Sequence, residues 1–328
     1  MLRRSHGSLL AAATWHAWHL KTSLRRFVLR LWLRRCLAEN VVYVGDDGAR
    51  LVGASALPPR RGDKLRLVVV SDTHTYEAAL RGVPNGDALV HCGDVLRGGK
   101  AEGERHVADL GKWLGAQPHG RKLVLGGNHD RLLESLPRAR VADLLGAGVT
   151  YVEDEGVVVK GVSLFLSPYS SPNNAASPNR AFQGAKRFDA MRAKLAAFRE
   201  RGAVDVLVTH GPPAGVLDCG AGSGGLAATV RDLRPRFHLF GHQHNVHGIE
   251  RVRDTVFVNC SVADGWFAVT RPPVVLDVAV AAARAPRRED VGWRTTTDVL
   301  RARVSVAARP PAGKGRLRPA AADAEPLL

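Results

Sequence analysis

Six short apolar runs in the middle of the chain constrain the fold of this protein most. They are LRLVVV (65–70), ALV (88–90), KLVL (122–125), VDVLV (204–208), FHLF (237–240) and TVFVN (255–259). Several are rich in Val and Leu and lack polar alternation, as is typical of strands buried on both faces. Helix candidates lie at 101–115, 131–145 and 185–201, and a hairpin is predicted at 155–166. The sequence therefore predicts an α/β fold in which helices cover the sheets.

Side chains that can bind a metal follow five of these runs. They are Asp72 and His74 after the first run, Asp94 after the second, Asn128, His129 and Asp130 after the third, His210 after the fourth, and His242 and His244 after the fifth. The carboxyl ends of strands in an open α/β sheet face one crevice, so we expect these side chains to converge. His238 lies inside the fifth run and His247 lies beyond it, and we expect no ligand role for either.

Each of these residues also has an ordinary structural explanation. Asp72 could cap a helix, and Asp94 could hold a turn after Gly93. Asn128 could occupy a left-handed turn, and His210 could be a hydrogen-bonded histidine at a strand end. Coincidence at five equivalent positions favours one shared metal site over five separate explanations.

The candidate ligands are carboxylates, an amide and imidazoles, without a thiolate. This mixture suits Mn²⁺, Fe or Zn²⁺ better than Mg²⁺ or Ca²⁺, which prefer oxygen ligands. Two ions about 4 Å apart would need a shared anionic ligand and could activate a bridging water as hydroxide. Such a pair suits the hydrolysis of a phosphate ester, because it can hold both the nucleophile and the phosphoryl oxygens.

The motifs follow one another in the order D-x-H, GD, GNHD, an isolated His and GHxH. In this order they resemble the calcineurin-like metallophosphoesterase superfamily, over about residues 65–280. The stretches SPYSSPNNAASPNRAFQ, HGPP, NCS and RPPVVLDV further resemble the small metallophosphoesterase-domain-containing proteins, which are related to cyclic-nucleotide phosphodiesterases. The resemblance implies a metallophosphoesterase-type β-sandwich of mixed sheets flanked by α-helices, in αββα layers.

The resemblance also implies a role for each motif residue. Asp72, His74 and His244 would bind one divalent ion, Asn128, His210 and His242 would bind the other, and Asp94 would bridge the two. His129 would contact the phosphate and protonate the leaving oxygen, and Asp130 could orient the His129 ring. Asp130 is equally well explained as a carboxylate at a helix N-terminus. Mn²⁺ is the expected metal, with Fe or Zn²⁺ as alternatives.

These roles predict a dinuclear metal-dependent phosphoesterase that acts on phosphodiesters such as cyclic nucleotides. Protein serine/threonine phosphatases resemble G-D-x-x-D-R-G after the second strand, whereas this chain has GDVLRGG without the second Asp. Some similar animal proteins lack the first histidine of GHxH and are weak enzymes, and the presence of His242 here favours activity.

Arg97, Arg131 and Arg180 could clamp a phosphate, although exposed arginines are usually solvated. The alternatives are a non-catalytic metal-binding scaffold that docks through basic ends, and a nuclease.

Basic residues are concentrated at the two ends of the chain. Residues 1–64 carry 12 Lys and Arg against 4 Asp and Glu, residues 65–280 carry 25 against 22, and residues 281–328 carry 10 against 5. We predict a partly disordered basic leader over 1–64, a metallophosphoesterase domain over 65–280, and an Ala/Arg/Pro-rich disordered tail over 281–328. The leader has the composition of an organelle transit peptide, and a membrane-surface helix would fit it as well. The nearly neutral core disfavours nucleic-acid binding, which the basic ends could provide.

Cysteine usage favours a reducing, intracellular compartment. The four cysteines Cys36, Cys92, Cys219 and Cys260 lie far apart and form no C-x-x-C pair. No apolar run reaches the ~18 residues of a membrane-spanning helix. We expect a cytoplasmic location, or a mitochondrial or plastid one if the leader acts in targeting. The expected partner is a small phosphate-ester substrate, and the sequence specifies no oligomeric state.

Overall fold

The computed structural model describes residues 40–80, 82–99, 102–173 and 177–280, which form two packed β-sheets. The first sheet contains β1 (Asn40–Gly45), β2 (Gly48–Gly53), β3 (Lys64–Val70), β4 (Ala88–His91), β5 (Arg121–Val124), β6 (Thr150–Tyr151) and β13 (Val274–Ala279). The second contains β7 (Glu155–Val159), β8 (Val162–Ser167), β9 (Val206–Thr209), β10 (Phe237–Phe240), β11 (Gly248–Val252) and β12 (Thr255–Asn259). Their orders are β2-β1-β13-β3-β4-β5-β6 and β11-β12-β10-β9-β8-β7.

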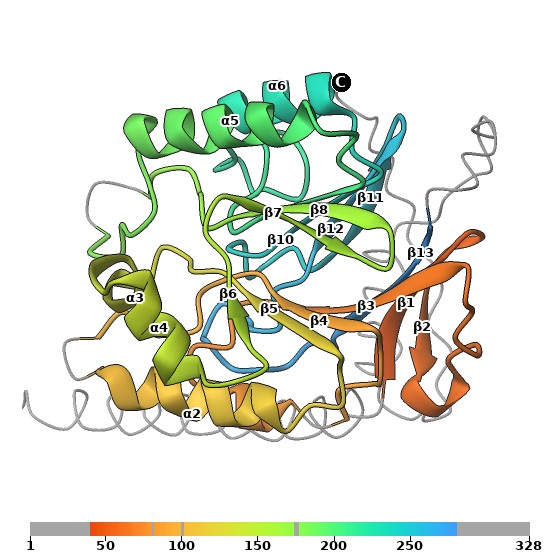
Figure 1. Ribbon diagram of the computed structural model, residues 1–328, viewed down its shortest axis with the longest axis horizontal. Coiled ribbons are helices and arrows are strands. Elements are labelled where there is room, and N and C mark those ends of the chain that lie inside the picture. Colours follow the sequence, from red (N-terminus) through yellow and green to blue (C-terminus); the bar gives the residue numbers. More distant parts are fainter. Residues whose placement is uncertain (1–39, 81, 100–101, 174–176, 281–328) are drawn as a thin grey trace, which may run out of the picture.

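Helices lie on the outer face of each sheet (Figure 1). They are α2 (Glu104–Gly115), α3 (Arg131–Ser135), α4 (Arg138–Leu145), α5 (Ala185–Arg199) and α6 (Gly224–Leu233), with 3₁₀ turns at Ala54–Ala56 and Glu77–Ala79. The first three lie beside the first sheet, and α5 and α6 cover the second. Both sheets contain parallel and antiparallel pairs. In the first sheet β3, β4, β5 and β6 run parallel, and β13 is antiparallel to β3. In the second sheet β8, β9, β10 and β12 run parallel, and β7 is antiparallel to β8. The predicted αββα sandwich of mixed sheets is confirmed.

The apolar runs are buried on both faces, as their lack of alternation indicates. In β3, Leu67 and Val69 face the core between the sheets, while Val68 and Val70 pack in the cluster that contains residues of α2 and α4. The second sheet repeats this arrangement, with a separate cluster of apolar residues beneath α5 and α6. Because successive side chains of a strand point to opposite faces, a strand between two apolar layers needs apolar residues at every position.

Two differences from the sequence prediction concern element boundaries. The hairpin β1–β2 lies within the predicted leader, yet β1 pairs with β13, so the first sheet extends N-terminal to residue 65. The helix expected over 131–145 is divided into α3 and α4, because Pro137 lacks the N–H that a continuous helix needs and holds Leu136 in an extended conformation.

Other predictions fall outside the residues that the structure describes. These are the first 39 residues of the leader predicted over 1–64, and the tail predicted over 281–328. Among the described residues, no helix combines the length and apolar character that a membrane span requires.

Candidate metal centre

The predicted metal ligands gather where the C-terminal ends of parallel strands from both sheets meet. They are Asp72 and His74 after β3, Asp94 after β4, Asn128 after β5, His210 after β9, and His242 and His244 after β10. Strands β3, β4 and β5 are parallel neighbours in the first sheet, and β9 and β10 are parallel neighbours in the second. Packing of the two sheets therefore brings all seven side chains to one place.

The first group of potential ligands contains Asp72, His74, Asp94 and His244, whose donor atoms lie within 4.8 Å of one another. Nε2 of His244 is 3.3 Å from Oδ1 of Asp72 and 3.2 Å from Nε2 of His74. Nε2 of His74 is 3.9 Å from Oδ2 of Asp94. The group thus contains the three residues assigned from the sequence to one ion, together with the carboxylate assigned as the bridge.

The second group contains Asp94 again, with His210 and His242. Nε2 of His210 is 3.2 Å from Oδ1 of Asp94 and 2.9 Å from Oδ1 of Asn128, and Nδ1 of His242 is 2.7 Å from the same amide oxygen. The Nδ2 group of Asn128 donates to the Asn179 carbonyl (3.4 Å), which turns the amide oxygen toward the two histidines. Asp94 is therefore shared, with one carboxylate oxygen near each group.

Backbone carbonyls fix the tautomers of two of these imidazoles. Nδ1 of His74 donates to the Leu96 carbonyl (2.8 Å), and Nδ1 of His210 donates to the Cys92 carbonyl (2.9 Å). A neutral ring held in this way has no proton on Nε2. Nε2 of His210 nevertheless faces two acceptor oxygens, on Asp94 and Asn128. Because lone pairs that face one another need a cation between them, the residues present fit a metal.

Two buried carboxylates dominate the electrostatics of the cluster. Asp72 and Asp94 are 0% and 1% exposed, and within the described residues their ion-pair partners are all histidines. Burial raises the pKa of Asp94, but His210 and His129 outweigh burial and hold that pKa well below its usual range. Burial lowers the pKa of His210, but Asp94 outweighs it and raises the pKa to about 9. The cluster thus favours positive charge, which a proton on His210 or a divalent cation can supply.

The ligand loops use backbone conformations that most residues avoid. Asp72, His74, Asp94 and His242 have φ values of +58°, +47°, +53° and +67°. Positive φ in non-glycine residues is uncommon and is concentrated at functional sites. The motif glycines are needed because the chain passes close to the carboxylates. A Cβ on Gly127 would lie 2.3 Å from Oδ1 of Asp94, and one on Gly241 would lie 2.2 Å from Oδ2 of Asp72.

His129 lies beside the cluster and is not a member of either group. Its Nδ1 donates to the Arg97 carbonyl (2.8 Å), and its Nε2 is 3.8 Å from Oδ2 of Asp94 and 3.2 Å from Nδ2 of Asn179. The backbone N–H of His129 also donates to Asp94 Oδ1 (2.9 Å). The ring is therefore anchored at Nδ1 and presents Nε2 toward the cluster.

Asp130 has contacts that differ from its predicted role. Its buried carboxylate accepts hydrogen bonds from the backbone N–H groups of Val95 (3.1 Å), Leu96 (2.8 Å) and Gly127 (2.7 Å). No hydrogen bond joins it to the His129 ring, which is held by Arg97 and Asn179 instead. Asp130 also stands at the N-cap of α3 without a side-chain cap hydrogen bond. Its carboxylate therefore ties together the loops after β4 and β5, which carry Asp94 and Asn128.

Two residues of the site were not predicted from the sequence. Asn179 contacts His129, and Phe267 lies edge-on to three histidines, with ring-centroid distances of 4.7 Å to His74, 5.7 Å to His129 and 5.2 Å to His244. Asn179 lies within the SPNR segment, which was noted only as part of a family resemblance. Phe267 comes from the loop after β12, where no periodic pattern marks it.

The arginines considered as phosphate clamps are exposed. The guanidinium of Arg97 donates to the Tyr76 hydroxyl (2.7 Å), that of Arg180 donates to the Ser177 carbonyl (3.0 Å), and Arg131 is exposed at the start of α3. Arg97 reaches the site through its backbone carbonyl, which accepts from His129. The contacts of these side chains therefore give no support to a clamp.

The two remaining histidines of the HLFGHQHNVHG stretch are buried away from the ligand groups. Nε2 of His238 is 2.8 Å from the Thr209 hydroxyl, and Nδ1 of His247 is 3.0 Å from the Ser261 carbonyl. Neither belongs to a group of potential ligands in the described part of the chain. Four neighbouring histidines thus divide into two candidate ligands and two packing residues.

Comparison with known proteins agrees with this arrangement. The family model for calcineurin-like phosphoesterases matches residues 65–246. The chain is 30% identical to human metallophosphoesterase domain-containing protein 1, over 67% of this chain and 73% of that protein. It is 29% identical to a UPF0046 protein of Caenorhabditis elegans, over 84% of this chain and 97% of that protein.

A solved structure, phosphopantetheinyl hydrolase from Mycobacterium tuberculosis, matches 70% of this chain and 100% of its own with 18% identity and a TM-score of 0.43, a likeness too low to carry an argument. The assignment rests on the family model, on the human relative and on a cluster of His and Asp residues that could hold metal ions. The chain therefore belongs to the calcineurin-like phosphoesterase family.

Proposed function

We propose that this protein is a dinuclear metal-dependent phosphodiesterase acting on small phosphodiesters. The observation that carries the proposal is the sharing of Asp94 between two groups of potential ligands. Asp72, His74 and His244 would hold one divalent ion, and Asn128, His210 and His242 the other. When bound, the ions would supply Lewis acidity to the phosphoryl oxygens and lower the pKa of a water nucleophile.

His129 supplies the proton for the leaving group in this proposal. Because its Nδ1 donates to the Arg97 carbonyl, a second proton can be carried only on Nε2, the nitrogen that faces the cluster. In the neutral ring Nε2 accepts from Nδ2 of Asn179 (3.2 Å), which orients the ring before it takes up the second proton. The arrangement suits a general acid for an alkoxide leaving group.

The charges around His129 favour a diester over a monoester. Its neighbours include the neutral side chains of Asn179 and Phe267, while the Arg97 guanidinium is bound to Tyr76. A phosphodiester carries one negative charge, whereas a monoester approaches two near neutral pH, as phosphorylated side chains do. Because Asn179 and Phe267 add no positive charge next to the ring, this side of the site suits the less charged substrate.

The mixed oxygen and nitrogen ligands make Mn²⁺ the expected metal, with Fe or Zn²⁺ as alternatives. Turnover of bis(p-nitrophenyl) phosphate and of p-nitrophenyl phosphate, each with Mn²⁺, Zn²⁺ or no added metal, tests the proposal. We expect faster turnover of the diester with Mn²⁺, and loss of that turnover in Asp94→Ala and His242→Ala.

A matched control is Asp143→Ala, on the exposed side of α4, which should retain wild-type turnover. Full diesterase activity in both ligand variants would overturn the proposal, and a strong preference for the monoester would replace it with a phosphatase. The scaffold and nuclease alternatives depend mainly on the basic ends, most of which lie outside the described residues.

A further inference from the structure

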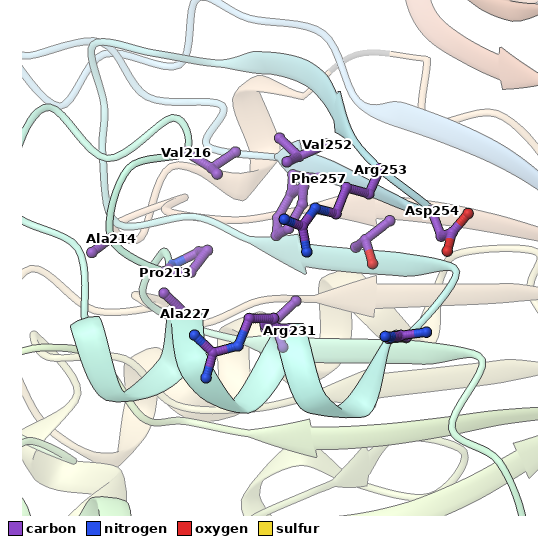
Figure 2. Close-up of a pocket in the computed structure, with 12 residues that line it drawn as sticks. Pro213, Ala214, Val216, Ala227, Arg231, Val252, Arg253, Asp254 and Phe257 are labelled. Carbon is purple, nitrogen blue, oxygen red and sulfur yellow. The ribbon is translucent and has the colours of Figure 1, made fainter. Parts of the chain in front are cut away.

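A pocket of about 390 Å³ lies at the edge of the second sheet (Figure 2). Its walls come from α6, from the β11–β12 hairpin and from residues 213–216. None of the seven candidate metal ligands lines it. The volume falls within the ~300–1,000 Å³ typical of small-molecule sites.

The floor of the pocket is apolar. Phe257 of β12 and Val230 of α6 are buried residues of the apolar cluster beneath α5 and α6, and Val216 packs against that cluster. Val252, at the end of the edge strand β11, leaves 40% of its surface exposed. An apolar ligand would remove this surface from water, which is favourable in proportion to the area covered.

The rim of the pocket is positively charged. Arg231, Arg234 and Arg253 line it, together with a single acidic residue, Asp254. Figure 2 shows Arg231 on α6 and Arg253 extending from the hairpin on the opposite side. Arg231 pairs with the exposed Asp232 (3.2 Å), whereas the guanidinium groups of Arg234 and Arg253 form no ion pair within the part of the chain that the structure describes.

The backbone conformation of two of these arginines gives a second, independent observation. Arg234 caps the C-terminus of α6 with φ +50°, and Arg253 is the first residue of the two-residue turn between β11 and β12 with φ +53°. Glycine is the common residue at both kinds of position because it takes positive φ without steric cost. Arginine at both, with the side chains lining one pocket, favours a role for the guanidinium groups there.

We propose that this pocket binds an amphipathic organic anion, with an apolar body and one carboxylate or phosphate group. The apolar body covers Phe257 and Val252, and the anionic group accepts hydrogen bonds from Arg234 and Arg253. Walls on three sides fit a free small molecule better than a lipid in a bilayer. The site is separate from the metal cluster and does not depend on the proposed hydrolysis.

Isothermal titration calorimetry of the full chain with decanoate tests the proposal. We expect binding that weakens about tenfold or more in Arg253→Gly, which suits the turn but removes the charge-assisted hydrogen bonds. Ala227→Phe on α6 should weaken binding as well, by filling the pocket. Decanol, which has the same chain without the charge, should bind about tenfold more weakly or worse.

The control is Arg201→Glu, which changes an exposed arginine beyond α5 and should leave decanoate affinity unchanged. Circular dichroism of each variant separates loss of binding from loss of folding. Equal affinity of Arg253→Gly and Arg201→Glu, equal affinity for decanol and decanoate, or no binding of decanoate to the full chain would each overturn the proposal. Binding to phosphatidylserine vesicles, lost in Arg253→Gly, with no binding of decanoate would assign the pocket to a membrane lipid instead.

Discussion

The two sheets contribute different chemistry to the metal cluster. The first sheet supplies its oxygen donors, Asp72, Asp94 and Asn128, together with His74. The second supplies only imidazoles, His210, His242 and His244. Each group of potential ligands takes residues from both sheets, His244 in the first group and His210 and His242 in the second, so both groups are complete only where the sheets pack against each other. The apolar core between the sheets is therefore as necessary to the chemistry as any single motif.

The largest effect should come from removing one ligand on either side. Asp72→Ala and His210→Ala should each lower kcat for a diester by about a thousandfold or more, because several kcal/mol of transition-state stabilisation depend on the ions. Metal content of the purified variants should fall in parallel. Retention of activity by one variant only would show that one sheet supplies a sufficient site alone.

The next largest effect concerns His129, which belongs to neither ligand group. His129→Ala should lower kcat about a hundredfold for a diester with an alkyl leaving group. It should matter much less for a p-nitrophenyl leaving group, which needs no proton, and metal content should remain at the wild-type level. An equal loss for both leaving groups would contradict the role as proton donor.

Removal of the metal should loosen the packing of the two sheets. At a metal concentration about a hundred times the dissociation constant, bound metal adds about 2.7 kcal/mol to the free energy of unfolding. Treatment with a chelator should therefore lower the melting temperature of the wild type in scanning calorimetry. The melting temperature of Asp94→Ala should change little with the chelator. An equal decrease in both proteins would show that the stabilising metal does not bind at this cluster.

The smallest effect concerns His238, an imidazole of the second sheet that is not a ligand. Burial lowers its pKa to about 3, so the unfolded chain binds a proton at pH values where the folded chain does not. Stability is then lost as the pH falls from ~6.5 toward 3, by up to about 1.4 kcal/mol per pH unit. In urea unfolding, His238→Gln should show a shallower decline between pH 6.5 and 5, with diesterase activity retained. Parallel curves for variant and wild type would contradict this explanation.

The sequence predicted those parts of the site for which a local sequence pattern also determines where a residue lies in the fold. The ligands could be located because each follows an apolar run, and parallel strands bring such positions together. The hairpin β1–β2 was missed because arginine-rich residues precede it, and the division at Pro137 was missed because the helical pattern continues past it. Asn179 and Phe267 come from loops whose path depends on tertiary packing, so no local pattern could place them beside His129.

The sharing of Asp94 would make the two proposed metal sites thermodynamically dependent on each other. An ion at one site withdraws negative charge from the carboxylate that the other site also uses, and it repels a second cation nearby. Occupancy of either proposed site would therefore weaken binding at the other by the same factor, since coupling between two binding equilibria is reciprocal. A metal titration should accordingly yield two unequal dissociation constants, one for the first and one for the second ion bound, which belong to the pair of sites and to neither site alone. At limiting metal, the half-loaded protein would then be the main bound form, so activity would rise later than total metal binding.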